Sequence, residues 1–243
     1  AGVAYKLWTR GEDGALAAYP PAEIESGDLA GFALELALWG AQAGDLAFVT
    51  PPHAGRLAEA HALLQMLGAL DTHGRITAHG RALAKLPLHP RLAHMVARGG
   101  RAAATLAAVL AERDPLRGAP LDLSHRMRAV SGERVPGEVH HATLARIRTE
   151  AKRLARSTHV GGPEDIGTLA ALAYPDRIGL RRKGDAARFV LSGGKGAVIA
   201  DGDPMAGARL IVATDLDGDP REARVRQGTP LSEAALRAAF GDQ

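Results

Sequence analysis

The sequence predicts a mainly helical chain that ends in a small β part, and three observations support this prediction. Apolar residues recur at helical spacing between residues 28 and 172. After Asp176 the pattern changes to short β-like runs separated by Gly and Asp turns. Hydrophobic residues make up 46% of the 243 residues and charged residues 23%, the composition of an ordinary globular protein. We therefore expect a packed core rather than a disordered chain.

Composition also excludes several classes of protein. No run of about 18 apolar residues could span a bilayer, and the N-terminus lacks the basic-then-apolar order of a signal peptide. The sequence has no cysteine, which excludes disulfides, thiolate nucleophiles and zinc sites with sulfur ligands. We expect a cytoplasmic protein without a membrane partner, in which only histidine and carboxylate metal sites remain open.

The first segment, Gly2-Val-Ala-Tyr-Lys-Leu-Trp8, partly alternates apolar and polar side chains, a pattern that predicts a strand. A strand needs a partner sheet, and the nearby sequence does not clearly supply one. We therefore expect the chain to be a piece of a longer protein.

Residues 21–86 have the elements of a winged helix. Asp28 can cap a helix that ends before Gly40, and Pro51-Pro52 opens a second helix that stops at Gly68. A hairpin is predicted over residues 69–77, and Thr77 can cap a third helix that runs through Leu83. Two helices, a hairpin and a short helix in this span predict a winged-helix domain.

Residues 87–175 predict a bundle of about five helices. Pro90 begins the first helix and Gly99-Gly100 breaks it. The residues Leu106, Val109 and Leu110 mark the next helix, and Asp122 can cap the one after it. A long helical segment follows from Val139 to Leu154, and a last one from Ile166 to Leu172.

Residues 176–243 predict a small β-barrel. The expected strands are short: 177–181, 188–191, 197–200, 209–213 and 222–226. Their number is that of an oligonucleotide-binding (OB) fold. A helix capped by Ser232 and running to Phe240 closes the chain.

Two short motifs resemble ligand loops but predict turns. Ser192-Gly-Gly-Lys-Gly196 lacks the glycine spacing of a phosphate loop and leads into a β run rather than a helix. Asp215-Leu-Asp-Gly-Asp219 begins like a calcium loop, but Pro220 and Arg226 occupy positions that require Gly and Glu. We expect both segments to connect strands.

The histidines do not predict a metal site. All ten lie between His53 and His159, and no pair is spaced four residues apart beside a catalytic Glu. No Gly-x-Ser-x-Gly motif marks a nucleophile. We therefore expect no catalytic, cofactor or metal site in this chain.

Basic residues concentrate in the middle of the chain. Residues 87–175 have 13 Lys and Arg against 8 Asp and Glu, whereas residues 1–86 have 6 against 9. One interpretation is a solvated surface in an Arg-rich chain, and the other is contact with nucleic-acid phosphates. The candidate contact residues are Arg146, Lys152, Arg153, Arg156, Arg177, Arg181, Arg182, Lys183 and Lys195.

Several motifs resemble those of DEAH-box helicases just after their second RecA-like domain. The most specific is Leu86-Pro-Leu-His-Pro-Arg-Leu92; the others are residues 2–8, 21–29, 74–77 and 80–81. Tyr174-Pro-Asp-Arg-Ile178, Arg181-Arg182 and Leu191-Ser-Gly-Gly-Lys-Gly-Ala197 resemble the bacterial HrpB branch in particular.

The resemblance implies an accessory C-terminal part of an ATP-dependent helicase. Residues 1–20 would be the end of the motor domain and a linker, and a further C-terminal region would follow Gln243. The ATPase motifs, and with them ATP and Mg²⁺, would belong to the full-length NTP hydrolase. The implied partners are single-stranded RNA or DNA and the protein's own N-terminal RecA-like domains. The alternative is a protein-interaction platform that regulates the motor without touching the strand. Salt-sensitive strand binding would distinguish the two, because only the strand-contacting function predicts it.

Overall fold

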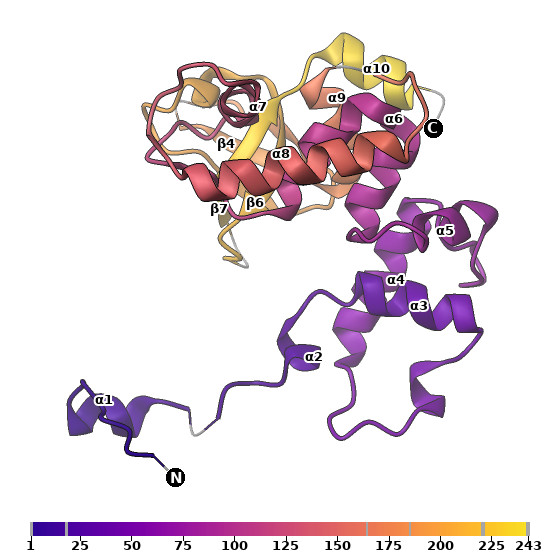
Figure 1. The fold of residues 1–243 in the computed structure, drawn as a ribbon, viewed down its shortest axis with the longest axis vertical. Coiled ribbons are helices and arrows are strands. Elements are labelled where there is room, and N and C mark those ends of the chain that lie inside the picture. Colours follow the sequence, from indigo (N-terminus) through magenta and orange to yellow (C-terminus); the bar gives the residue numbers. More distant parts are fainter. Residues whose placement is uncertain (1, 18, 164, 185, 220–221, 242–243) are drawn as a thin grey trace.

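The computed structural model describes residues 2–17, 19–163, 165–184, 186–219 and 222–241. Figure 1 shows three regions in space: an extended N-terminal arm, a helical part beside it, and a larger part in which long helices pack against a barrel. Short 3-10 turns lie at Ala43–Asp45, Pro175–Arg177 and Pro204–Gly207.

The N-terminal arm does not form the predicted strand. Residues 2–8 have no strand partner among the described residues, and Val3, Tyr5 and Leu7 are 80%, 83% and 92% exposed. The prediction was wrong for this chain because a strand is held by pairing its backbone with a neighbour. The arm has two short helices, α1 (Arg10–Ala15) and α2 (Glu23–Ser26), and Thr9 caps the first.

The next part confirms the predicted helix, helix, hairpin and helix. These are α3 (Ala30–Trp39), α4 (Ala54–Met66), a Leu70–Ile76 bridge and α5 (Ala78–Leu83). The Asp28 carboxylate accepts a hydrogen bond from Ala30 N at 2.8 Å, and Thr77 Oγ1 accepts one from Gly80 N at 2.9 Å. Their shared core includes Leu29, Leu34, Leu64, Leu67 and Leu83.

Four longer helices form the predicted bundle: α6 (Pro90–Ala111), α7 (Leu123–Ser131), α8 (His141–Arg156) and α9 (Ile166–Ala173). Their common core contains Met95, Leu106, Leu123, Ile147, Leu154 and Leu169. Val139, expected in the long helix, instead lies in β2 (Glu138–Val139), which pairs with β1 (Leu116–Arg117). His140 caps α8, so the helix begins one residue after this strand.

Helix α6 is kinked at Gly100, as the double glycine predicted. Gly100 has a φ of 58°, a left-handed conformation that glycine adopts without strain. A side chain there would collide with the Gly161 carbonyl and approach His159. Arg101 N donates to the His159 carbonyl at 2.9 Å, so the α8–α9 loop fits into the kink.

The β part is the predicted barrel. Its strands are β3 (Ile178–Arg181), β4 (Arg188–Leu191), β5 (Gly196–Val198), β6 (Leu210–Leu216) and β7 (Glu222–Pro230). They close in the order β3-β4-β5-β7-β6, with only the β5–β7 pairing parallel. Helix α10 (Glu233–Phe240) follows and is capped by Ser232.

Strand β6 joins the barrel to the bundle. Ile211 and Ala213 belong to the barrel core, whereas the alternate residues Leu210 and Val212 pack with Ala170 and Ala171 of α9. Successive side chains of a strand point to opposite faces, so the outer face of β6 is turned to the bundle. Thr214 continues the series of Leu210 and Val212, and it is also buried.

Candidate nucleic-acid interface

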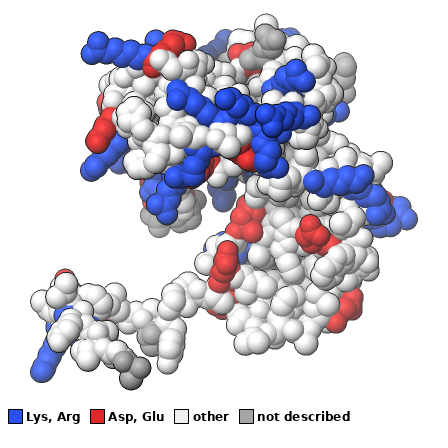
Figure 2. Space-filling model, in the orientation of Figure 1, with Lys and Arg blue, Asp and Glu red and all other residues white. Residues whose placement is uncertain are grey.

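Helix α8 presents a basic face. Leu144, Ile147 and Leu154 recur at helical spacing and are buried against the bundle. The opposite face is exposed, and Figure 2 shows Lys and Arg gathered across the front of the molecule where α8 runs in Figure 1. The exposed cations of the helix are Arg146, Arg148, Lys152, Arg153 and Arg156.

These cations differ in their partners. Arg146 Nε lies 2.8 Å from Glu112, and Arg153 Nη2 lies 2.5 Å from Glu150. Arg148 donates to the carbonyl of Val130 at 2.8 Å and so ties α8 to the end of α7. Lys152 and Arg156 have no ion pair or side-chain hydrogen bond within the described part of the chain. These two are therefore free to bind an external phosphate.

The barrel candidates also fall into two groups. Arg182 and Lys183 are exposed in the β3–β4 loop, and Lys195 is exposed in the β4–β5 turn. The Ser192–Gly196 segment is thus a hairpin turn, as predicted. Of the second predicted turn, Asp215 and Leu216 belong to β6, residues 217–219 follow the strand, and Pro220 lies outside the described residues. Arg181 is half-buried and donates to the carbonyl of Ala206 at 2.7 Å. The exposed group can reach a ligand as it stands, whereas Arg181 supports the barrel.

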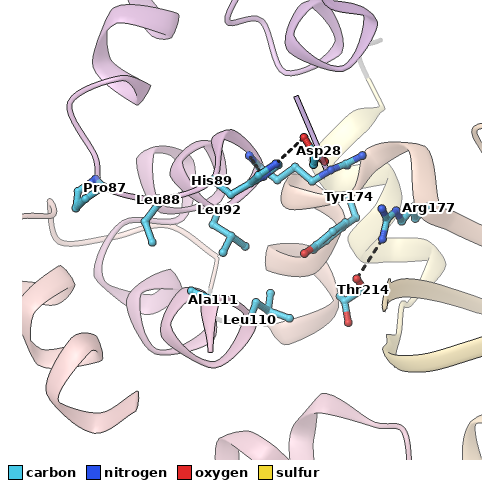
Figure 3. A pocket seen from close by; sticks show the side chains of 11 residues that line it. Asp28, Pro87, Leu88, His89, Leu92, Leu110, Ala111, Tyr174, Arg177 and Thr214 are labelled. Atoms are coloured by element: carbon cyan, nitrogen blue, oxygen red, sulfur yellow. Dashed lines mark hydrogen bonds and ion pairs between the residues drawn. The ribbon is translucent and has the colours of Figure 1, made fainter. Parts of the chain in front are cut away.

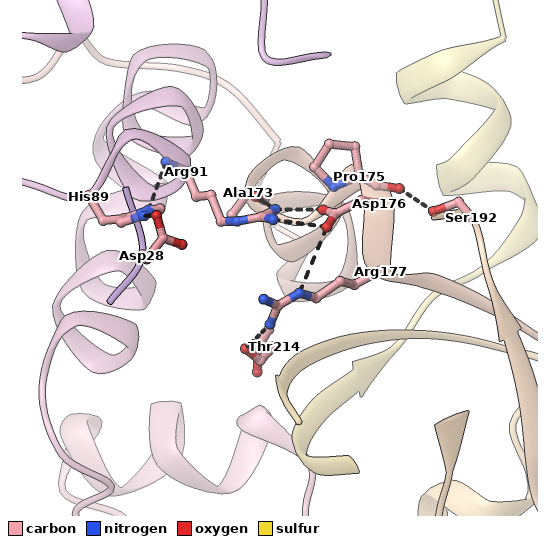
Figure 4. Close-up of polar contacts among 9 residues, drawn as sticks. All are labelled: Asp28, His89, Arg91, Ala173, Pro175, Asp176, Arg177, Ser192 and Thr214. Carbon is pink, nitrogen blue, oxygen red and sulfur yellow. Dashed lines mark hydrogen bonds and ion pairs between the residues drawn. The ribbon is translucent and has the colours of Figure 1, made fainter. Parts of the chain in front are cut away.

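A partly buried ion pair joins the bundle to the barrel. Arg91 at the start of α6 is 7% exposed, and its two terminal nitrogens lie 2.5 and 2.9 Å from the carboxylate of Asp176 (Figure 4). Arg91 also donates to the carbonyl of Ala173 at 3.1 Å. Burial raises the pKa of Asp176, but the hydrogen bonds from Arg91 and the charges of Arg91 and Arg177 outweigh it, and the pKa lies below its usual value. The carboxylate is therefore a charged, structural partner.

Arg177 lies in the same junction. Its guanidinium and that of Arg91 each lie 5.1 Å from the centre of the Tyr174 ring. Arg177 donates to the Thr214 carbonyl at 3.2 Å, and it lies 3.9 Å from Asp176. Burial, and then the charge of Arg91, lower the pKa of Arg177. This candidate is thus a half-buried cation rather than a surface one.

The junction also receives a contact from the first helical part. His89 Nε2 lies 3.2 Å from the Asp28 carboxylate, and His89 Nδ1 accepts a hydrogen bond from Arg91 N. The contact with His89 lowers the pKa of Asp28 to about 2, against the opposing effect of burial. The N-cap residue of α3 is Leu29 rather than the predicted Asp28, but the Asp28 carboxylate binds both the first backbone N–H of α3 and His89 at the start of α6.

A pocket of about 390 Å³ lies at this junction (Figure 3). Asp28 and His89 contribute to one wall, and Tyr174, Arg177 and Thr214 to another (Figure 3). A second pocket, of about 560 Å³, lies between α6 and α8 and shares Pro87, Leu88 and Ala111 with the first. Glu112 and Arg146 line that second pocket. The two pockets thus run from the junction to the basic helix.

Neither pocket was predicted from the sequence, because their lining comes from distant segments. One pattern did point to Thr214, since it is a polar residue in phase with the buried Leu210 and Val212. The histidines also make a contact that spacing did not reveal: His79 Nε2 lies 2.8 Å from His94 Nδ1. Within the described ranges, no group of three or more His, Asp or Glu is placed to hold a metal ion.

Comparisons with known proteins agree with this architecture. The helicase-associated domain (HA2) family, winged-helix type, matches residues 60–88. A search of the curated proteins finds no match. Among the described helices, none is both long and apolar enough to cross a membrane.

Two solved structures are similar over nearly the whole chain. The Escherichia coli DExH-box NTPase HrpB is 30% identical with a TM-score of 0.74, covering 96% of this chain and 28% of that one. The Escherichia coli DEAH/RHA helicase HrpB is 26% identical with a TM-score of 0.71, covering 93% of this chain and 28% of that one. This chain thus spans little more than a quarter of the length of either. Its fold and sequence identify it as a C-terminal accessory region of the HrpB-like DEAH/RHA helicase type.

Proposed function

We propose that this chain holds single-stranded nucleic acid and couples it to an ATP-dependent helicase motor. The observation that supports the proposal most directly is the pair of exposed cations on α8, Lys152 and Arg156, which have no partner within the described residues. A cation already engaged in an ion pair must give up that partner to bind phosphate, whereas a free one need not. Lys152 and Arg156 are therefore the first contacts we expect a strand to make.

The barrel supports the same function. In OB folds, the loop between the first and second strands is one of the loops that bind oligonucleotides. Here that loop joins β3 to β4 and has the exposed Arg182 and Lys183. Lys195 in the next turn would extend the same surface. Because these groups bind backbone charge, we expect little dependence on base sequence.

The chemistry of ATP hydrolysis is assigned to other parts of the full-length protein. The only Gly-rich segment with a lysine in the sequence, Ser192–Gly196, is a hairpin turn here, and it does not lead into a helix as a phosphate loop must. This segment therefore does not fit the phosphates of ATP. We assign ATP and Mg²⁺ to RecA-like motor domains of the same polypeptide, in a cytoplasmic protein. The units that act on the strand would be a winged helix (21–86), a bundle (87–175) and an OB-like domain (176–243), following a motor end and linker (1–20).

The proposal is tested by fluorescence anisotropy of this chain with labelled single-stranded RNA and DNA at low and high salt. We expect binding that weakens as salt rises, because phosphate contacts release counterions. The double variant Lys152→Glu and Arg156→Glu should weaken binding to all base sequences. The matched control is Arg81→Glu with Lys85→Glu, the same change of charge at exposed residues on and just after α5. Equal loss in both double variants would argue against a site on α8.

One observation favours the alternative, a platform that binds protein. Large apolar side chains are exposed outside the bundle: Tyr5 is 83% exposed, Leu7 92% and Trp39 73%. Tyr5 and Leu7 lie two residues apart on the N-terminal arm, and neighbouring exposed apolar side chains of this kind can form part of a protein-binding surface. Absence of strand binding even at low salt would support this function instead.

A further inference from the structure

The junction pocket contains polar groups that the fold leaves unsatisfied. Thr214 is 6% exposed and Arg91 is 7% exposed. Thr214 Oγ1 and Arg91 Nε are buried, and neither has a hydrogen-bond partner among the described residues. Both residues line the pocket of about 390 Å³. His89 Nε2, which lies 3.2 Å from Asp28, is a third buried atom of the lining without a hydrogen-bond partner among the described residues. Buried polar groups are ordinarily paired, so unpaired groups around one cavity call for an external partner.

The pocket favours an anion at its barrel side. Arg91 is neutralised by Asp176, but Arg177 lies 3.9 Å from that carboxylate and has one hydrogen bond to a described residue, to the Thr214 carbonyl. A guanidinium has five N–H donors, so most of those of Arg177 remain for a ligand. The Thr214 hydroxyl can donate to the same ligand. An oxyanion would thus meet a cation and a hydroxyl together.

The opposite side of the pocket accepts hydrogen bonds. Asp28 lies there with His89 (Figure 3), and its carboxylate stays ionised at neutral pH because its pKa is about 2. A carboxylate accepts hydrogen bonds from hydroxyl and amino groups. Tyr174 adds an aromatic surface to the pocket lining, on the side of Arg177 and Thr214. The size falls within the roughly 300–1,000 Å³ of small-molecule sites.

We propose that the junction pocket binds one phosphate-bearing nucleotide unit. The phosphate lies against Arg177 and the Thr214 hydroxyl, and Asp28 accepts from a sugar hydroxyl or a base amino group. The unit is a nucleotide of the bound strand or a free mononucleotide. In the first case the inference rests on the proposed function, because it names where the strand leaves the basic face of α8 and enters the fold.

Thr214 permits a clean test because its hydroxyl is not used by the fold. Thr214→Val removes the hydroxyl, keeps the shape of the side chain and suits a β-strand. Removing an unpaired buried hydroxyl should leave the Tm unchanged or raise it. Thr214→Ser keeps the hydroxyl but removes a buried methyl group, which should lower the Tm. The two variants should therefore move stability and ligand binding in opposite directions.

Binding is measured by titration calorimetry with adenosine monophosphate and by anisotropy with a short single-stranded RNA. We expect Thr214→Val to weaken binding by about tenfold, the value of one charge-assisted hydrogen bond. Thr214→Ser should bind like the wild type. So should Thr229→Val, in which the lost hydroxyl belongs to a buried threonine of β7 outside the pocket.

The two ligands separate the two sources. If Thr214→Val weakens binding of the mononucleotide, a free nucleotide is enough to occupy the pocket. If it weakens binding of RNA only, the bound strand supplies the nucleotide unit. Unchanged binding of both ligands by Thr214→Val overturns the inference and leaves the pocket to water. If Lys152→Glu with Arg156→Glu weakens RNA binding while Thr214→Val does not, the proposed function stands and the pocket inference fails. If the wild type binds the mononucleotide but no RNA, and Thr214→Val loses mononucleotide binding, the pocket inference stands and the proposed function fails.

Discussion

The junction around Tyr174 and the outer face of α8 both concentrate arginine, yet they use it differently. At the junction, Arg91 is 7% exposed and its charge is matched by Asp176. On α8 the side chains of Arg146 and Arg153 are 54% and 52% exposed, although each has an acidic partner. Removing one member of a buried ion pair leaves an uncompensated charge and destabilises the fold strongly, whereas water screens the charges of a surface pair. We therefore expect the Arg91–Asp176 pair to contribute mainly to stability, and the exposed cations of α8 to contribute mainly to strand binding.

The sharpest way to break this comparison is Asp176→Asn. Removing one member of a buried pair leaves the Arg91 charge uncompensated, and we expect a loss of about 3 kcal/mol in the free energy of unfolding. Urea denaturation at neutral pH measures it. A loss no larger than that of a surface substitution would show that the junction is not a stabilising centre.

A second test uses pH at a partly buried contact, where His79 of α5 meets His94 of α6. Burial, and then the charges of His79 and Arg98, lower the pKa of His94 to about 4. In the unfolded chain His94 is protonated near pH 6.5, whereas in the folded chain it is protonated only near pH 4. The stability contributed by neutral His94 is therefore full above about pH 6.5 and lost as pH falls to about 4, by roughly 2–3 kcal/mol.

Urea midpoints between pH 7 and pH 4 measure this loss. The control is His94→Gln, which can still form hydrogen bonds but does not titrate in this range. Its stability should fall less steeply over the same interval. Identical slopes in the two proteins would assign the pH dependence to other groups.

The third test compares free and paired cations on α8. Lys152→Ala with Arg156→Ala should reduce strand affinity and lower the slope of log K against log salt by about 1.4, the value for two phosphate contacts on a single strand. Arg146→Ala with Arg153→Ala removes the same charge, but from residues already paired with Glu112 and Glu150. We expect the smaller change from this control. The reverse order would show that the strand displaces the acidic partners.

The smallest effect is expected from Glu150→Gln, which frees Arg153. The urea midpoint should be indistinguishable from that of the wild type, because exposed pairs contribute little. Strand affinity should rise slightly, since one more cation becomes available. A clear destabilisation would place this surface pair in the same class as the buried junction.

Local structure was predictable wherever the deciding atoms are close in sequence. Thr77, Asp122 and Ser232 were predicted as helix caps, and each accepts a hydrogen bond from a backbone N–H two or three residues later. The glycines at 99–100 correctly predicted the break in α6. The strand predicted over residues 2–8 failed because its partner is not among the neighbouring residues.

The candidate site was predictable only in part. Lys152, Arg156, Arg182 and Lys183 were recognised by charge, and they are exposed. Arg177 was recognised as basic but not as half-buried, and Arg91 was not a candidate. Arg91 meets Asp176 across 85 positions of sequence, a separation that no local pattern encodes.

The sequence by itself determined the order of elements, the breaks between them and the concentration of positive charge in the bundle. Caps, glycine turns and apolar periodicity act over a few residues, so they can be recognised in a single chain. Only the tertiary structure decided which cations are free, which are buried, and that Asp28, Tyr174 and Thr214 enclose one pocket. Availability and enclosure depend on burial and on partners from distant segments, and these arise only when the helices and the barrel pack together.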